Sequence, residues 1–132
     1  MGYRNRVLIA EDDFELRALI ARAFAEDGYY VLEVENGREL FDLLAGLVQV
    51  DLVVSDVRMP GGSGLAALAG FRKRNPSTPF VIITAFGNEA LHQEARRLGA
   101  TAVVDKPFEM DDLRALARRL SDPNSGPGDV GP

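Results

Sequence analysis

The sequence has no cysteine and no tryptophan, and His92 is its only histidine. The lack of cysteine excludes disulfides, thiolate metal sites and cysteine nucleophiles, and it fits a cytoplasmic protein. No apolar run approaches the roughly 20 residues that a membrane-spanning helix needs. The four apolar residues before Glu11 lead straight into acids and are too few for a signal peptide. His92 lies in a charged helical segment, which favours a solvated surface position.

Basic residues are too few for a nucleic-acid-binding surface, which needs clustered Lys and Arg. The chain has 15 Lys and Arg against 20 Asp and Glu, a net charge of -5. We therefore expect no direct nucleic-acid partner and no membrane partner. The 132 residues suit one domain with one core.

Five short apolar runs alternate with five segments of helical periodicity. The first run, at residues 7–10, is short and rich in branched residues, which is typical of a strand buried on both faces. The alternation predicts an α/β fold, a doubly wound parallel sheet with helices on both faces. The five predicted strands lie at residues 7–10, 30–34, 52–54, 80–83 and 102–104.

The segments that join these elements are rich in glycine and proline. Gly28 and Gly99 are expected to end helices, residues 36–37 to form a turn, and residues 60–64 to form a loop. The chain beyond Ser121 has almost nothing apolar to bury. We therefore expect a domain at residues 1–121 and a disordered tail or linker at residues 122–132.

Polar residues stand where the apolar runs stop. The first run ends at three acids, the third at Asp56, the fourth at Thr84 and the fifth at Lys106. Any one of these residues alone is ordinary at a strand end. Because parallel strands end at one edge of the sheet, where ligands bind, the whole set is expected to meet there. The three acids after the first run are Glu11, Asp12 and Asp13.

The chemistry of this set points to phosphoryl transfer. Oxygen ligands without His or Cys suit a hard cation, so Glu11, Asp12 and Asp56 are candidate Mg²⁺ ligands. Asp56 is the candidate nucleophile towards phosphorus, as carboxylates are in aspartyl-phosphate chemistry. Lys106 would offset charge on the phosphoryl oxygens, and the Thr84 hydroxyl would donate to one of them.

Four segments carry a family resemblance: residues 8–13 (LIAEDD), 53–61 (VVSDVRMPG), 82–85 (IITA) and 105–108 (DKPF). In residue identity, order and separation these segments resemble the receiver domain of two-component response regulators, across roughly residues 5–121. They most closely resemble receivers of the nitrogen-regulation type. The resemblance implies a CheY-like, flavodoxin-like sandwich with strand order 2-1-3-4-5. It also implies a regulatory phosphoacceptor rather than an enzyme, with self-catalysed phosphotransfer and slow autodephosphorylation only.

The resemblance further implies roles and partners. Asp56 takes the phosphoryl group from a histidine kinase or a phosphotransfer protein. The metal is Mg²⁺, with Mn²⁺ as a substitute, bound by Glu11, Asp12, Asp56 and the Arg58 backbone carbonyl. Thr84, the Ala85 N–H and Lys106 contact the phosphoryl group, and the Lys106–Pro107 peptide is cis. Output passes to a protein partner or a tethered effector, and a phosphorylation-dependent homodimer is left open.

Asp13 and three positions around the expected site, Arg58, Phe86 and Val103, carry expectations of their own. Strand register favours Glu11 and Asp12 as the acidic pair, which leaves Asp13 to cap the first helix. Many receivers carry an aromatic residue where this chain has Val103, so we expect output to rely on the Thr84 loop and the fourth helix. Arg58 and Phe86 would flank the path of attacking water. Phe86 either crowds that water or merely packs on the loop.

Three other functions compete with a phosphorylated receiver. A pseudo-receiver used only for binding usually loses part of the acid, Thr and Lys set, which is complete here. An aspartate-dependent phosphatase typically needs an acid where Arg58 stands. A flavodoxin would need a hydroxyl- and glycine-rich phosphate cradle in the first loop, where this chain has acids, although the fold itself is shared.

Overall fold

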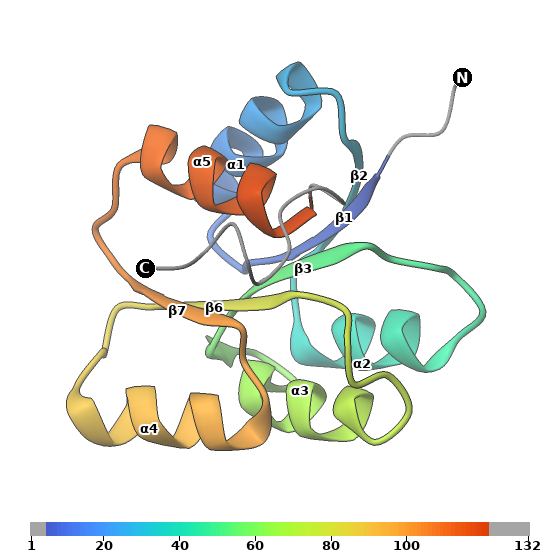
Figure 1. Ribbon diagram of the computed structural model, residues 1–132, viewed down its shortest axis with the longest axis vertical. Coiled ribbons are helices and arrows are strands. Elements are labelled where there is room, and N and C mark those ends of the chain that lie inside the picture. Colours follow the sequence, from blue (N-terminus) through green and yellow to red (C-terminus); the bar gives the residue numbers. More distant parts are fainter. Residues whose placement is uncertain (1–4, 122–132) are drawn as a thin grey trace.

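The computed structural model describes residues 5–121, and its centre is a five-stranded parallel sheet (Figure 1). The strand order β2-β1-β3-β6-β7 is the predicted order 2-1-3-4-5, with two short hairpin strands left out of the count. All four neighbouring pairs are parallel. The strands are β1 (Arg6–Ala10), β2 (Tyr30–Val34), β3 (Leu52–Asp56), β6 (Phe80–Thr84) and β7 (Ala102–Asp105).

Helices cover both faces of the sheet, because successive strand side chains point to opposite sides. Val7 and Ile9 of β1 pack towards the α1 and α5 side, and Leu8 and Ala10 pack towards α2, α3 and α4. Figure 1 shows these two layers above and below the sheet. The helices are α1 (Phe14–Glu26), α2 (Gly37–Ala45), α3 (Gly64–Arg72), α4 (Glu89–Leu98) and α5 (Met110–Ser121).

Side-chain caps start four of the helices. Asp13 accepts a hydrogen bond from the Leu16 N–H at 3.1 Å, so the prediction that it caps α1 is confirmed. Asn36 caps α2 in the same way and Gly37 is the first helical residue, so the predicted turn at 36–37 is wrong. Gly99 caps α4 in the left-handed region, whereas α1 is capped by Asp27 and Gly28 follows it.

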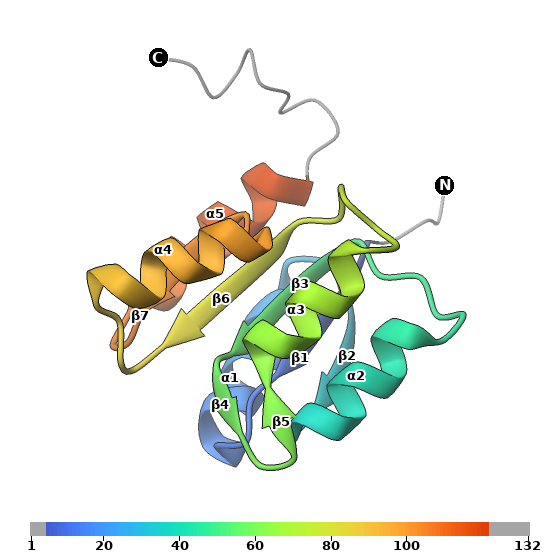
Figure 2. The same ribbon diagram turned by 90° about the horizontal axis from the view of Figure 1, so that it is seen from below.

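The predicted loop at residues 60–64 is confirmed only at Pro60 and Gly61, which form the turn of a small antiparallel hairpin. Strands β4 (Arg58–Met59) and β5 (Gly62–Ser63) pair across Pro60 and Gly61, and Gly64 already opens α3. Gly61 has φ +80, as the third position of a Pro-Gly turn requires. Figure 2 shows the hairpin at the end of the sheet where β3 finishes. Arg58 opens the hairpin two residues after Asp56, and its N–H lies 3.4 Å from Asp56 Oδ1.

None of the helices within residues 5–121 combines the length and apolar character needed to cross a bilayer. The tail predicted at residues 122–132 lies outside the described residues.

Candidate phosphoacceptor site

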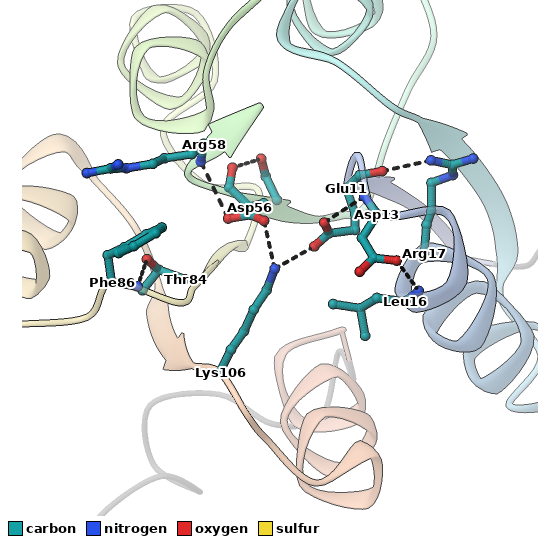
Figure 3. Close-up of polar contacts among 10 residues, drawn as sticks. Glu11, Asp13, Leu16, Arg17, Asp56, Arg58, Thr84, Phe86 and Lys106 are labelled. Carbon is teal, nitrogen blue, oxygen red and sulfur yellow. Dashed lines mark hydrogen bonds and ion pairs between the residues drawn. The ribbon is translucent and has the colours of Figure 1, made fainter. Parts of the chain in front are cut away.

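Three carboxylates gather where β1 and β3 end. Each of Glu11, Asp12 and Asp56 offers an oxygen, and these oxygens lie within 4.8 Å of one another. Glu11 is 1% and Asp56 7% exposed, whereas Asp12 faces solvent. The pairing of β1 with β3 explains the convergence, since Ala10 lies opposite Ser55 and the acids follow directly. Asp13, the remaining acid, points its carboxylate to the start of α1 (Figure 3).

Lys106 joins two of these acids from the opposite side of the site. Its Nζ donates to Asp56 Oδ2 at 2.7 Å and to Glu11 Oε1 at 2.9 Å (Figure 3). The Lys106 main chain is held as well, because its N–H donates to the Thr84 carbonyl at 2.7 Å. The peptide bond that follows, Lys106–Pro107, is cis. The ammonium therefore sits against carboxylates 95 and 50 residues away in sequence.

Burial and pairing act in opposite directions on these charges. Burial raises the pKa of Glu11 above its ordinary value, against the lowering effects of the Asp13 N–H and of Lys106, and the nearby Asp56 adds to the rise. Burial also disfavours the charged form of Lys106, but its hydrogen bonds to Asp56 and Glu11 outweigh this and raise its pKa. The site thus carries excess negative charge that one ammonium only partly offsets.

The donor set fits a hard divalent cation. It consists of carboxylate oxygens, with no His or Cys ligand among the grouped residues, and one of the three acids is open to solvent. Mg²⁺ prefers such oxygen sites and keeps part of its water shell. Glu11, Asp12 and Asp56 are therefore able to hold Mg²⁺, while the ligand role of the Arg58 carbonyl stays a prediction.

Thr84 ends β6 and is 1% exposed, on the strand beside β3. Its Oγ1 accepts the Phe86 N–H at 3.0 Å, so the hydroxyl is engaged with its own loop (Figure 3). The Phe86 ring is 57% exposed, and the Arg58 guanidinium lies 4.3 Å from its centre. This contact links the loops after β3 and β6 at the mouth of the site.

The backbone around Asp56 is held by close packing with the start of α3. A Cβ on Gly64 would collide with the Asp56 carbonyl oxygen and lie 2.7 Å from Ser55 Oγ. The Ser55 hydroxyl donates to that same carbonyl at 2.8 Å, and the Gly64 N–H donates to Val57 at 2.9 Å. Glycine at position 64 therefore allows α3 to approach the strand that carries Asp56.

Two interactions near the site were missed in the sequence. His92 was expected to be solvated, but its side chain is only 19% exposed and its Nε2 lies 2.8 Å from Asp105 Oδ1. A Cβ on Gly87 would collide with that same Asp105 oxygen, so this glycine makes room for the pair. Arg17 lies on α1, a charged residue whose position along the helix indicates only a solvated surface, yet its Nη1 donates to the Glu11 carbonyl at 2.8 Å. Residue spacing held no signal for either contact.

The other predicted positions lie around this centre. Ala85 is exposed directly after β6, and its role towards a phosphoryl group stays a prediction. Val103 pairs with Ile82 in the sheet and is half-buried against the α2, α3 and α4 side.

Known proteins share both the sequence pattern and the fold. The sequence-family model of the response regulator receiver domain matches residues 7–118 of this chain. NtrC, a DNA-binding transcriptional regulator of Escherichia coli, is 36% identical over 116 residues, which cover 88% of this chain but only 24% of NtrC. Sporulation initiation phosphotransferase F of Bacillus subtilis is 29% identical, with 87% of this chain and 92% of that protein covered.

A solved structure gives the same answer for the fold. The receiver domain of the Francisella response regulator 1452 superposes with a TM-score of 0.83 at 29% identity, covering 89% of this chain and 97% of that one. The chain thus spans about a quarter of the first curated relatives that it matches and nearly the whole of solved receiver domains. It belongs to the response regulator receiver domain family, the regulatory domains of two-component systems.

Proposed function

We propose that this chain is a phospho-accepting switch, in which Asp56 receives a phosphoryl group from a phosphohistidine of a histidine kinase or phosphotransfer protein. The observation that carries the proposal is the contact of Lys106 Nζ with both Asp56 and Glu11, inside a cluster of three carboxylates. A half-buried lysine that donates to a carboxylate is placed to donate next to a phosphoryl group bonded to that carboxylate, where the negative charge then lies.

The transfer forms one bond and breaks another. An Asp56 oxygen attacks phosphorus, the P–N bond to the donor imidazole breaks, and the imidazole leaves as it takes up a proton. Lys106 stays at hydrogen-bonding distance and donates to an oxygen of the new acyl phosphate. Mg²⁺ held by Glu11, Asp12, Asp56 and the Arg58 carbonyl would supply further charge neutralisation, and Mn²⁺ would substitute for it.

The direct test is incubation of the chain with a small phosphodonor such as acetyl phosphate, with and without Mg²⁺. The expected product is one acid-stable, base-labile phosphate per chain, seen by intact mass, that forms with Mg²⁺ and not with EDTA. A chain that stays unmodified at saturating donor and Mg²⁺ would instead indicate a receiver used only for binding.

Output is proposed to pass through the Thr84 loop and α4. Thr84 would exchange its bond with the Phe86 N–H for one to the phosphoryl group, while the Ala85 N–H donates to another oxygen, and the loop that leads into α4 would move with it. Val103 offers no ring to take part. The output would act on a downstream protein or on a tethered effector, in the cytoplasm. A homodimer of phosphorylated chains is one way in which the altered surface would be used. The domain limits 1–121 belong to the same proposal.

Replacing Thr84 by Ala should leave Asp56 phosphorylation largely intact but uncouple it from the α4 face. We expect the amide NMR shifts of α4 to respond to beryllofluoride and Mg²⁺ in the wild type and to respond much less in Thr84→Ala. A variant whose α4 shifts match the wild type in size would contradict a role for the hydroxyl in output.

Replacing Phe86 by Ala should shorten the lifetime of the phosphorylated state. The ring and the Arg58 guanidinium stack across the mouth of the site, and their loss would admit water. An exposed cation–π contact is worth about 0.5–1 kcal/mol, which corresponds to hydrolysis faster by about two- to fivefold. The decay of purified phosphorylated protein measures this, and an unchanged rate would mean that the ring only packs on its loop.

A further inference from the structure

Arg17 is a charged residue of α1 that turns away from solvent, towards the back of the acidic site. Its side chain is only 11% exposed. Its Nη1 donates to the backbone carbonyl of Glu11 at 2.8 Å, and its Nε donates to Glu33 Oε1 at 3.2 Å. Glu35 Oε1 lies 3.9 Å from Nη1. One guanidinium therefore ties α1 both to the end of β2 and to the peptide that joins Glu11 and Asp12.

The tie acts on the peptide from which two of the three clustered carboxylates extend. Figure 3 shows the Glu11 carbonyl pointing to Arg17, while the Glu11 side chain points the other way, to Lys106. On its amide side Glu11 is held too, since its N–H donates to the Val34 carbonyl at 3.1 Å. A planar peptide fixed through its carbonyl sets the directions in which the side chains before and after it leave the backbone.

Such a restraint matters because the clustered acids repel one another. Glu11, Asp12 and Asp56 have oxygens within 4.8 Å of one another. Without a restraint the exposed Asp12 would relax outwards into water. Groups that orient metal ligands from behind typically change metal affinity by about 10- to 100-fold when they are removed.

We infer that Arg17 is a positioning residue for the divalent cation site: it holds the Glu11–Asp12 peptide so that both carboxylates face Asp56. The inference rests on the proposed function, which supplies the need for the cation. Geometry rather than charge carries it, because the Arg17 charge is already matched by Glu33 and Glu35. Arg17 also donates in two directions at once from a rigid plane, which a lysine does not reproduce.

The experiment measures cation affinity rather than activity. Mn²⁺ binding is followed by the EPR signal of free Mn²⁺, and Mg²⁺ binding by calorimetry, for the wild type, Arg17→Ala and Arg17→Lys. Both variants should bind the cation about tenfold more weakly. The Mg²⁺ concentration for half-maximal phosphorylation should rise by the same factor, while the rate at saturating Mg²⁺ changes less than about threefold.

Arg114→Ala is the matched control for loss of an arginine that anchors α1. Arg114 forms a two-pronged ion pair with Asp27 at the end of α1, at 2.6 and 2.9 Å, on the α5 side. The Arg114→Ala variant should have a lower melting temperature than the wild type and the same cation affinity. Glu33→Gln, which keeps Arg17 but weakens one of its bonds, should weaken binding by about two- to threefold and serves if Arg17→Ala fails to fold.

The outcomes separate the two proposals. A wild-type chain that binds neither cation would remove the metal from the proposed function. A wild type that binds, beside Arg17→Ala and Arg17→Lys that bind within twofold of it, would overturn the positioning role and leave the proposed function standing. Equal losses in the Arg17 variants and in Arg114→Ala would also overturn it, as a general effect of stability.

Discussion

Asn in place of Asp56 will abolish formation of the acid-stable, base-labile phosphate. The amide has no anionic oxygen to attack phosphorus, and it cannot form an acyl phosphate. The fold should persist, because Asn has nearly the same shape and its oxygen still accepts from Lys106 Nζ, which contacts Asp56 at 2.7 Å in the wild type. Intact mass after treatment with phosphodonor and Mg²⁺ measures the loss, and circular dichroism checks the fold.

Asp51→Asn is the matched control for this change. Asp51 lies directly before the same strand, β3, at the opposite edge of the sheet, where it accepts the Arg6 N–H at 2.7 Å. We expect Asp51→Asn to be phosphorylated like the wild type. A phosphate that survives in Asp56→Asn would mean that another residue, with Asp12 as the nearest alternative, accepts the group.

The second large effect is expected for Lys106→Met. Methionine fills much of the same volume but leaves Glu11, which is 1% exposed, and Asp56 without their shared cation. Removal of one partner of a buried ion pair typically costs several kcal/mol, and we expect a loss of about 3 kcal/mol in the free energy of unfolding at neutral pH without Mg²⁺. Added Mg²⁺ should restore part of it by binding only the folded acids. Phosphotransfer should fall by on the order of a hundredfold.

The loss in Lys106→Met should depend on pH, with a sign that follows from Glu11. Its pKa in the fold is raised above the ordinary 4.5, so between 4.5 and the raised value the folded chain keeps a proton that the unfolded chain has lost. The contribution of Glu11 to the free energy of unfolding is therefore fully present below pH 4.5 and is lost as pH rises towards its raised pKa. Without Lys106 the pKa of Glu11 rises further, so the variant should lose least near pH 4.5 and most at neutral pH.

The Lys106 ammonium itself makes the stability depend on pH in the alkaline range. Its pKa is raised above 10.5 by its carboxylate partners, so its contribution is present below that value and lost as pH rises through the folded pKa.

The control is Lys73→Met, which removes the other lysine of the sequence at the exposed end of α3. Urea unfolding at several pH values compares the three proteins. A Lys106→Met chain as stable as Lys73→Met at neutral pH would contradict the account of an uncompensated acidic cluster.

Much of the site was predictable because it depends on few rules. Apolar runs that stop at Glu11, Asp56, Thr84 and Lys106 identify buried parallel strands, and parallel strands end at one edge of the sheet. The cap at Asp13 depends only on a short-range bond to the Leu16 N–H, which makes it local as well. The hairpin of β4 and β5 was missed because two-residue strands leave no periodicity to read.

By itself, therefore, the sequence determined the order of strands and helices and the set of residues at one edge of the sheet, since hydrophobic periodicity and chain direction are written along the chain. Only the tertiary structure decided which atoms meet there. Lys106 Nζ lies between Glu11 and Asp56, Arg17 holds the Glu11 carbonyl, and Thr84 Oγ1 faces its own loop. Such contacts depend on side-chain directions and on packing between segments distant in sequence, and no spacing of residues along one strand or helix specifies them.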